Sequence, residues 1–221
     1  MVSSRKLFYR WGLALLLTAG LALSAPLAAN AEPQEAAPST ANADPQEVVR
    51  STADAVLHEV ETRRSELEAA PEQIYALVEQ YVLPNFDFEL MSRLALGRHW
   101  ASATPEQQAQ FTEGFRELLV RTYATALLNY SGQKITYLPF ELPADAERVR
   151  VPTQVFAAPG SPPVPVDYEL FQRDDAWRVY DVRIDGISML QNYRTSFTNE
   201  IRRYQLSGLI ERISDKNKGL E

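Results

Sequence analysis

The chain contains no cysteine and only two histidines among its 221 residues. Without cysteine there is no disulfide, no thiol nucleophile and no thiolate metal site. His58 and His99 have no second ligand at helical or strand spacing, so we predict no metal site and interpret both as structural or surface residues. The sequence also has no Gly-rich phosphate loop and no Gly-x-Ser-x-Gly turn. These absences remove most common catalytic centres.

Long apolar runs are equally scarce, and the single candidate, residues 11–23, lies near the N-terminus. Three basic residues and no acidic residue precede it, and Ala29-Asn30-Ala31 follows with the small-x-small pattern that signal peptidase accepts. The run is shorter than the roughly 20 residues that span a bilayer. We therefore predict that residues 1–31 are a cleaved signal peptide and that the mature chain is periplasmic.

An excess of basic residues is absent too. The formal charge is -7, and removal of the three basic residues of the signal takes it to -10. This balance argues against nucleic acid as a partner. Residues 32–43 are rich in Ala, Pro, Gln, Ser and Asn and are predicted to form a disordered tether. Roughly 190 mature residues remain, which is enough for one hydrophobic core.

Helix signals occupy the first half of the mature chain. Asp44 is a good N-cap and Pro45 suits the first helical position, so a helix begins there and continues through Val60. Residues 104–107 combine a Thr cap, a Pro at the first position and a Gln three residues after the cap, which predicts a helix to about Tyr130. Apolar spacing predicts two more helices, at 71–84 and 86–96.

After Gly132 the apolar period changes from 3.6 to 2. Four alternating stretches, 135–137, 149–155, 164–170 and 180–184, predict a four-stranded antiparallel sheet with one apolar face. Ser188 then caps a helix, and a last helix covers 206–213 before a charged tail at 216–221. The fold class is therefore α+β, with one domain over residues 44–215.

Paired carboxylates are the remaining candidates for catalysis. Asp181 and Asp185 lie near one strand end, and Asp87 and Glu89 lie near the third helix. A catalytic acid of this kind needs burial that raises its pKa. Asp181 and Asp185 are more often solvated or paired with arginine, and Asp87 is more often a helix cap. We assign no catalytic residue.

Tyrosines fall on the apolar stripes of the helices and strands, and two interpretations of them stay open. They either pack in an ordinary core with their hydroxyls at an edge, or they line a cavity between the sheet and the long helix. Periodicity does not separate the two. The tyrosines concerned are Tyr123, Tyr130, Tyr137, Tyr168, Tyr180 and Tyr193.

An ordered set of segments resembles the toluene-tolerance family, the periplasmic phospholipid-binding proteins of the Mla lipid-transport pathway. No single segment is very specific, but their order and spacing are, and the resemblance covers about residues 45–213. The segments are 82–88, 96–100, 103–108, 111–123, 177–182, 186–190 and 192–194.

The resemblance implies a fold and a function. The fold would be a twisted, nuclear-transport-factor-like sheet with added helices that encloses an apolar pocket. The function would be a phospholipid carrier that moves lipid between the outer and inner membranes and maintains outer-membrane lipid asymmetry. The implied partners are phospholipid, as cargo and not as a cofactor, an outer-membrane lipoprotein held with a porin, and an inner-membrane ABC transporter with a ring of lipid-handling domains. A monomer is expected.

The resemblance also lets us predict which residues hold the cargo. From the sheet we expect Val151, Val155, Val166, Tyr168, Val182 and Ile184 to line the pocket; from the helices and the last turn we expect Tyr123, Leu127, Ile187, Met189 and Tyr193. Arg98 and Arg194 are candidates for the mouth and the lipid phosphate, although salt bridges to nearby carboxylates would explain them equally well.

Two other functions remain open. An enzyme on the same kind of cone-shaped sheet would need a polar, half-wet pocket with a buried carboxylate. A ligand-free module that docks envelope complexes would have a solid core and no cavity.

Overall fold

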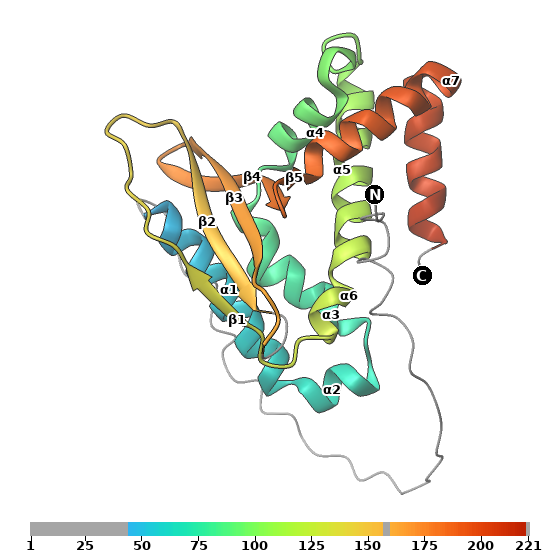
Figure 1. Ribbon diagram of the computed structural model, residues 1–221. Coiled ribbons are helices and arrows are strands. Elements are labelled where there is room, and N and C mark those ends of the chain that lie inside the picture. Colours follow the sequence, from blue (N-terminus) through green and yellow to red (C-terminus); the bar gives the residue numbers. More distant parts are fainter. Residues whose placement is uncertain (1–43, 157–159, 220–221) are drawn as a thin grey trace, which may run out of the picture. The chain divides into compact units, whose positions relative to one another are not determined.

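The computed structural model describes residues 44–156 and 160–219 (Figure 1). The predicted signal peptide and tether, residues 1–43, lie outside the described residues. Helices α1 to α6 come first, a five-stranded antiparallel sheet in the order β1-β2-β3-β4-β5 follows, and the long helix α7 comes last. This confirms the predicted α+β class and the antiparallel sheet, which has one strand more than the four predicted.

Local sequence signals explain where the helices begin. Asp44 accepts a hydrogen bond from the backbone N–H of Gln46 at 2.8 Å and so caps α1. At α5, Thr104 and Gln107 form the predicted reciprocal capping box. Tyr123 ends α5, and a short α6 replaces the predicted continuation to Tyr130. The helical elements are α1 (Pro45–Thr62), α2 (Arg64–Ala69), α3 (Gln73–Leu77), η2 (Val78–Val82), η3 (Leu83–Asn85), α4 (Phe88–Leu96), η4 (Gly97–His99), α5 (Pro105–Tyr123) and α6 (Thr125–Leu128).

The strands pair in sequence order, so each is joined to the next by a hairpin. Their bounds are β1 (Lys134–Tyr137), β2 (Arg148–Phe156), β3 (Val164–Arg173), β4 (Ala176–Ile184) and β5 (Ile187–Ser188). The fifth strand was not predicted because two residues are too short to show alternation. A bulge in β4 places Asp181 opposite Glu169 and Val179 opposite Leu170, so Tyr180 is the extra residue.

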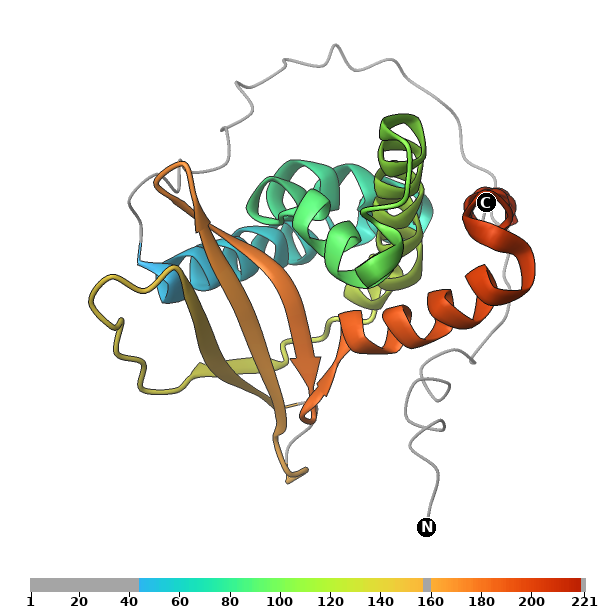
Figure 2. The same cartoon turned by 90° about the horizontal axis from the view of Figure 1, so that it is seen from above.

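One face of the sheet packs on α1. Val48 and Val49 of α1 form a buried cluster with Val151 of β2 and with β3 and β4 residues, including Leu170 and Trp177. The views in Figures 1 and 2 agree that the strands curl and that α1 lies against this face. A second cluster lies among α4, α5 and α7, where Phe111, Phe115 and Phe197 contact one another. The domain therefore has a sheet layer and a helical layer around α5.

Two buried aspartates join helices to strand β4. Asp87 accepts a hydrogen bond from the backbone N–H of Leu90 at the start of α4, and its own N–H donates to the carbonyl of Val179. Asp181 accepts hydrogen bonds from the Ser188 hydroxyl and from the backbone N–H of Leu190, at the start of α7. Both carboxylates therefore satisfy N–H groups that helix ends leave without partners.

Helix α7 (Met189–Lys218) has two limbs joined by a kink. Gln205 at the kink has φ 62° and ψ 174°, a conformation that is almost confined to glycine and costs about 1–3 kcal/mol elsewhere. The second limb returns beside α5 (Figure 1), where the side-chain amide of Asn217 donates to the Gly114 carbonyl at 3.0 Å. Residues 216–218, which the sequence assigned to a tail, continue this limb.

We expect Asp181→Ala to lower the free energy of unfolding by about 3 kcal/mol, because it leaves buried donors at the start of α7 without their charged acceptor. Urea denaturation followed by circular dichroism measures the change. Asp54→Ala, at an exposed position on α1, is the control. Equal stability of the two variants would contradict the assigned role of Asp181.

Candidate functional site: the apolar face of the sheet

The predicted sheet residues share one face. Cross-strand partners lie on the same side of a sheet, and the register pairs Val151 with Tyr168 and Tyr168 with Val182. It likewise pairs Val166 with Ile184. Val155 lies four residues beyond Val151 on the same strand and therefore points to the same side. The alternation in the sequence correctly identified this face.

Burial changes along the face from one end to the other. At the end under α1, Val149, Leu170 and Val179 form a cross-strand row that is fully buried. Toward the other end, where β2 stops and β3 begins, Val155, Val164, Val166 and Ile184 are all half-buried. Val151, with no exposed surface, belongs to the covered part. The part of the face that solvent reaches is therefore the end near Val166 and Ile184.

The predicted residues outside the sheet are more dispersed. Tyr123, at the end of α5, is 38% exposed, and Ile187, in β5, is 49% exposed. Met189 and Tyr193 pack on the margin of the α4–α5–α7 cluster. Leu127 packs on a third cluster, which α1, α2 and α3 share with Ala124. The structure therefore places these residues at the margins of the cores rather than inside them.

Arg194, one of the two arginines predicted for the mouth, lies against the backbone next to the other. Gly97, with φ 55°, ends α4 in a conformation that favours glycine. A Cβ on Gly97 would lie 3.0 Å from the Arg194 guanidinium, so Arg194 contacts the residue next to Arg98 in the chain. Both arginines are exposed. The end of α4 and the first limb of α7 thus bring two separate motif segments into contact.

Burial also affects the tyrosines. Desolvation raises the pKa of Tyr168 above its usual value, and it does the same for Tyr137 on the same face. Desolvation is again the main reason that the pKa of Tyr193 is raised, and the neighbouring Tyr123 adds to the effect. These phenols stay protonated at neutral pH, so the sheet face carries no charge from them.

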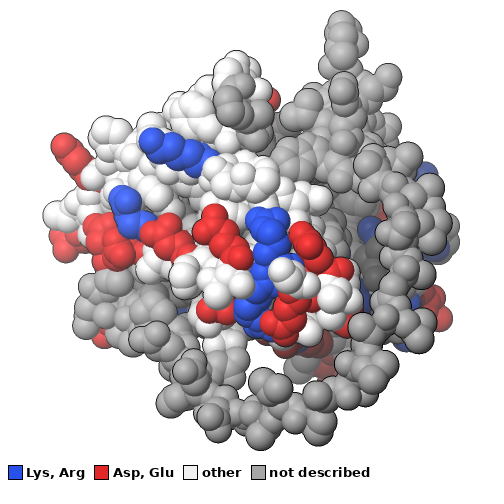
Figure 3. Space-filling model, turned by 90° about the horizontal axis from the view of Figure 1, so that it is seen from below, with Lys and Arg blue, Asp and Glu red and all other residues white. Residues whose placement is uncertain are grey.

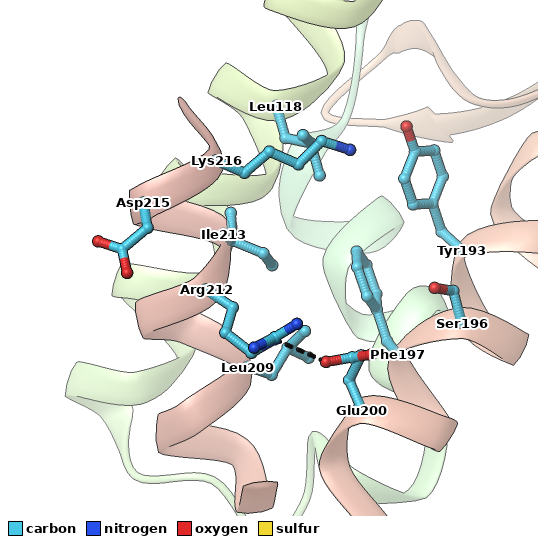
Figure 4. Close-up of a pocket in the computed structure, with 10 residues that line it drawn as sticks. All are labelled: Leu118, Tyr193, Ser196, Phe197, Glu200, Leu209, Arg212, Ile213, Asp215 and Lys216. Atoms are coloured by element: carbon cyan, nitrogen blue, oxygen red, sulfur yellow. Dashed lines mark ion pairs between the residues drawn. The ribbon is translucent and has the colours of Figure 1, made fainter. Parts of the chain in front are cut away.

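Two cavities lie elsewhere. One, of about 530 Å³, opens between the two limbs of α7 and α5, and Leu118, Phe197 and Ile213 are among its lining residues (Figure 4). Glu200 and Arg212 form an ion pair of 2.8 Å across it. The other, of about 350 Å³, lies beside Ile187 at the β4–β5 turn. Tyr193 lines the first cavity, while an enclosed pocket over the sheet stays a prediction.

Other chemistry is limited among the described residues. The sequence suggested that Asp181 is solvated or paired with an arginine, and this was wrong, because Asp181 is buried. Its carboxylate oxygens accept hydrogen bonds from the Ser188 hydroxyl and the Leu190 N–H at the start of α7. Within residues 44–156 and 160–219 there is no group of three or more His, Asp or Glu side chains that could hold a metal ion. The helices of the same residues include none that is long and apolar enough to cross a membrane. On the face drawn in Figure 3, acidic and basic side chains are interspersed.

Three further residues of the sheet face were not among the predicted lipid-binding residues. Ile135 and Val164 both pair with Val155 at the half-buried end, and Tyr137 pairs with the buried Thr153. Their alternation was visible in the sequence, but the register that places them beside Val155 was not. Arg50 of α1 lies 4.2 Å from the centre of the Tyr137 ring.

This arrangement places the protein in a class of α+β domains that turn the apolar face of a curled antiparallel sheet toward helices. A phospholipid-binding protein from Ralstonia solanacearum, solved in complex with a phospholipid, has the same fold. The TM-score is 0.74 at 35% sequence identity, and the match covers 80% of this chain and 99% of that one.

The sequence comparisons identify the family. The family model described as MlaC protein matches residues 50–215, and the chain therefore belongs to the MlaC family. It is 25% identical over 157 residues to the intermembrane phospholipid transport system binding protein MlaC of Haemophilus influenzae, covering 70% of this chain and 73% of that protein. It is 28% identical over 149 residues to the toluene tolerance protein ttg2D of Pseudomonas putida, covering 67% and 68%. The predicted family resemblance is confirmed.

The raised pKa of Tyr168 predicts a loss of stability in alkali. A folded-state pKa above the unfolded value of 10.0 gives a stabilising contribution that is complete below that pH and is lost as the pH rises through the folded pKa. We expect the free energy of unfolding to fall above about pH 10, and Tyr168→Phe to reduce that fall. Urea denaturation at several pH values measures it, with Tyr204→Phe, 46% exposed, as the control. An unchanged slope in Tyr168→Phe would refute the assignment.

Proposed function

We propose that this protein is a phospholipid carrier that holds the acyl chains of one lipid against the apolar face of its sheet. The observation that carries the proposal is the structural match, at 35% identity and over 80% of this chain, to a protein solved with a bound phospholipid. The two curated relatives, one of which is named for intermembrane phospholipid transport, support the same function.

Physical chemistry explains why such a carrier needs an apolar face. Each methylene exposed to water costs roughly 0.8 kcal/mol, so about thirty methylenes in two chains cost on the order of 20 kcal/mol. A site for such chains needs contact with apolar side chains and few hydrogen bonds along its depth. The half-buried rows around Val166 and Ile184 offer that contact.

The lipid head group stays at the opening of the site in this proposal. Arg98 and Arg194 are exposed, Arg194 lies against Gly97, and a guanidinium group is a good donor to phosphate oxygens. Neither arginine has an ion-pair partner among the described residues. They are therefore the candidates to contact the phosphate, with no strong selectivity among head groups.

The cellular setting follows from the family and from the N-terminal sequence. Residues 1–31 direct the chain to the periplasm, where it works as a monomer between two membranes. Its partners are an outer-membrane lipoprotein held with a porin and an inner-membrane ABC transporter with a ring of lipid-handling domains. Phospholipid is the cargo and not a cofactor in this proposal, which assigns the protein no reaction, and the naming of its relatives as binding and transport proteins supports this.

The first test is native mass spectrometry of the mature protein purified without detergent. We expect a mass increase of one phospholipid per chain, and mixed head groups after solvent extraction. Protein that is isolated without lipid and takes none from vesicles would refute the proposal and favour a docking module.

A substitution on the apolar face should block loading. Val166→Trp places a bulky ring on the half-buried face, and we expect the lipid-bound fraction in native mass spectrometry to fall at least about tenfold, because contacts with the chains are lost. Gln154→Trp, one position away in register and on the opposite face, is the matched control and should load normally. Equal loading of the two variants would move the lipid away from this face.

The arginine pair should affect how tightly the lipid phosphate is held. For Arg98→Ala combined with Arg194→Ala, we expect the lipid-bound fraction in native mass spectrometry to fall with the head-group distribution unchanged, because a charge-assisted contact to the phosphate that all phospholipids share is lost. Arg202→Ala, an exposed change further along α7, is the control. An unchanged lipid-bound fraction would remove Arg98 and Arg194 from the site.

A further inference from the structure

Helix α7 differs from the rest of the domain in its charge. It carries six basic and three acidic residues, whereas the remaining residues from 44 to 219 carry thirteen basic and twenty-three acidic ones. Residues 201–210, around the kink, include Arg202 and Arg203 and no acidic residue. Because the chain as a whole is acidic, this local excess of positive charge points to a partner of opposite charge.

The two limbs of α7 meet at an exposed bend, which we define as residues 202–206. Arg202, Arg203 and Gln205 are exposed. Tyr204 is 46% exposed and is the one exposed large apolar side chain of α7. Figures 1 and 2 both place the bend at the edge of the domain away from β1 and β2. A flat surface therefore reaches the bend without meeting the sheet.

The bend is held in a fixed conformation by the domain. Gln205 has φ 62° and ψ 174°, and residues other than glycine in such conformations cluster at functional sites. A Cβ on Gly208 would lie 2.7 Å from the Cβ of Tyr204, so glycine is required there. Beyond it, Leu209 and Ile213 are buried in the cluster with α5 and fix the second limb. The exposed side chains of the bend are therefore presented on a rigid backbone.

The domain does not neutralise most of the positive charge of the bend. Arg202 and Arg203 have no ion-pair partner in the part of the chain that the structure describes. Arg212 of the second limb has its guanidinium 4.7 Å from the centre of the Tyr204 ring, and its Nε lies 2.8 Å from an oxygen of Glu200. The bend thus combines two exposed guanidinium groups with an aromatic ring that a third guanidinium covers.

We infer that the bend binds the surface of an anionic lipid bilayer. Guanidinium groups donate to the phosphates of lipid head groups, and tyrosine is enriched where membrane and water meet. Each arginine near an anionic surface adds a modest attraction, so contact through one bend is weak, reversible and sensitive to salt. The contact does not depend on what the protein carries, but a weak one suits the carrier proposed above, which has to leave each membrane again.

A bilayer fits the bend better than a protein partner does. Protein interfaces have a buried apolar centre from which charged residues are depleted. In the bend the exposed apolar surface comes mainly from Tyr204, and it is surrounded by positive charge, since Arg202 and Arg203 precede it and Arg212 lies on its ring. This leaves no apolar centre for a protein to cover, whereas lipid head groups supply a phosphate for each arginine.

Vesicle binding tests the inference. The mature protein is sedimented with vesicles of phosphatidylcholine and phosphatidylglycerol, and with vesicles of phosphatidylcholine alone. We expect binding to the anionic vesicles only, and its loss when the salt concentration is raised. For Arg202→Ala combined with Arg203→Ala, we expect the partition coefficient on anionic vesicles to fall by about tenfold or more, because two of the attracting charges are removed.

Lys216→Ala combined with Lys218→Ala is the matched control. It removes the same charge from exposed positions near the other end of the second limb. Lys216 is about 15 Å along the helix from Leu206, which exceeds the Debye length of about 8 Å at physiological ionic strength. We expect the control to bind anionic vesicles within about twofold of the wild-type protein. A fall as large as that of the arginine variant overturns the inference, because binding would then follow net charge alone.

Tyr204→Trp locates the contact directly. With anionic vesicles we expect the fluorescence of this variant, measured against the wild-type protein, to shift to shorter wavelengths and to be quenched by lipids with brominated chains, because the ring enters the interface. A variant that sediments with the vesicles but shows no shift overturns the placement of the contact at the bend.

The remaining outcomes separate this inference from the cargo and from stability. The arginine variant should keep its lipid-bound fraction in native mass spectrometry, because docking on a bilayer leaves the affinity of the cargo site unchanged. Basic residues in the last turn of a helix also stabilise it, so a purely structural role would lower stability in urea and leave vesicle binding unchanged, which overturns the inference. Failure of the wild-type protein to bind anionic vesicles also overturns it and favours a protein partner. If the arginine variant does not fold, Tyr204→Trp decides.

Discussion

Two buried carboxylates on and beside strand β4 hold the domain together. Asp87 starts α4 and bonds to the backbone of β4, and Asp181, within β4, starts α7. A buried carboxylate is costly unless donors surround it, and helix starts supply such donors in fixed positions. Helix α5 packs against both of these helices, and its Phe111 and Phe115 contact Phe197 of α7. The position of α5 relative to the sheet is therefore set by the two helices that β4 anchors.

The helices leave the apolar face of the sheet only partly covered. Helix α1 closes one end of its apolar face, and the other end, around Val166 and Ile184, stays half-buried. A completely covered face would give a stable but closed core, and an uncovered one would aggregate. The intermediate arrangement suits a ligand whose own surface is apolar, which agrees with membership of the MlaC family.

Much of this was predictable from sequence, since caps and alternation are local signals. The caps at Asp44, Thr104 and Ser188 and the shared face of Val151, Val166 and Val182 were all visible. The bulge at Tyr180 and the burial of Asp181 were not, because long-range packing decides them. The tyrosines of the apolar stripes illustrate the limit, since alternation located Tyr168 on the face but gave no measure of how far a helix covers it.

The half-covered face also makes the folding stability of the protein depend on whether a ligand is bound. A ligand that binds the native but not the unfolded chain stabilises the native state by RT ln(1 + [L]/Kd). An unloaded molecule lacks that contribution and keeps Val155, Val166 and Ile184 partly in contact with water. The chain has no disulfide to compensate. Quality-control proteases would then act on empty molecules first, and the abundance of the protein would rise and fall with the supply of lipid.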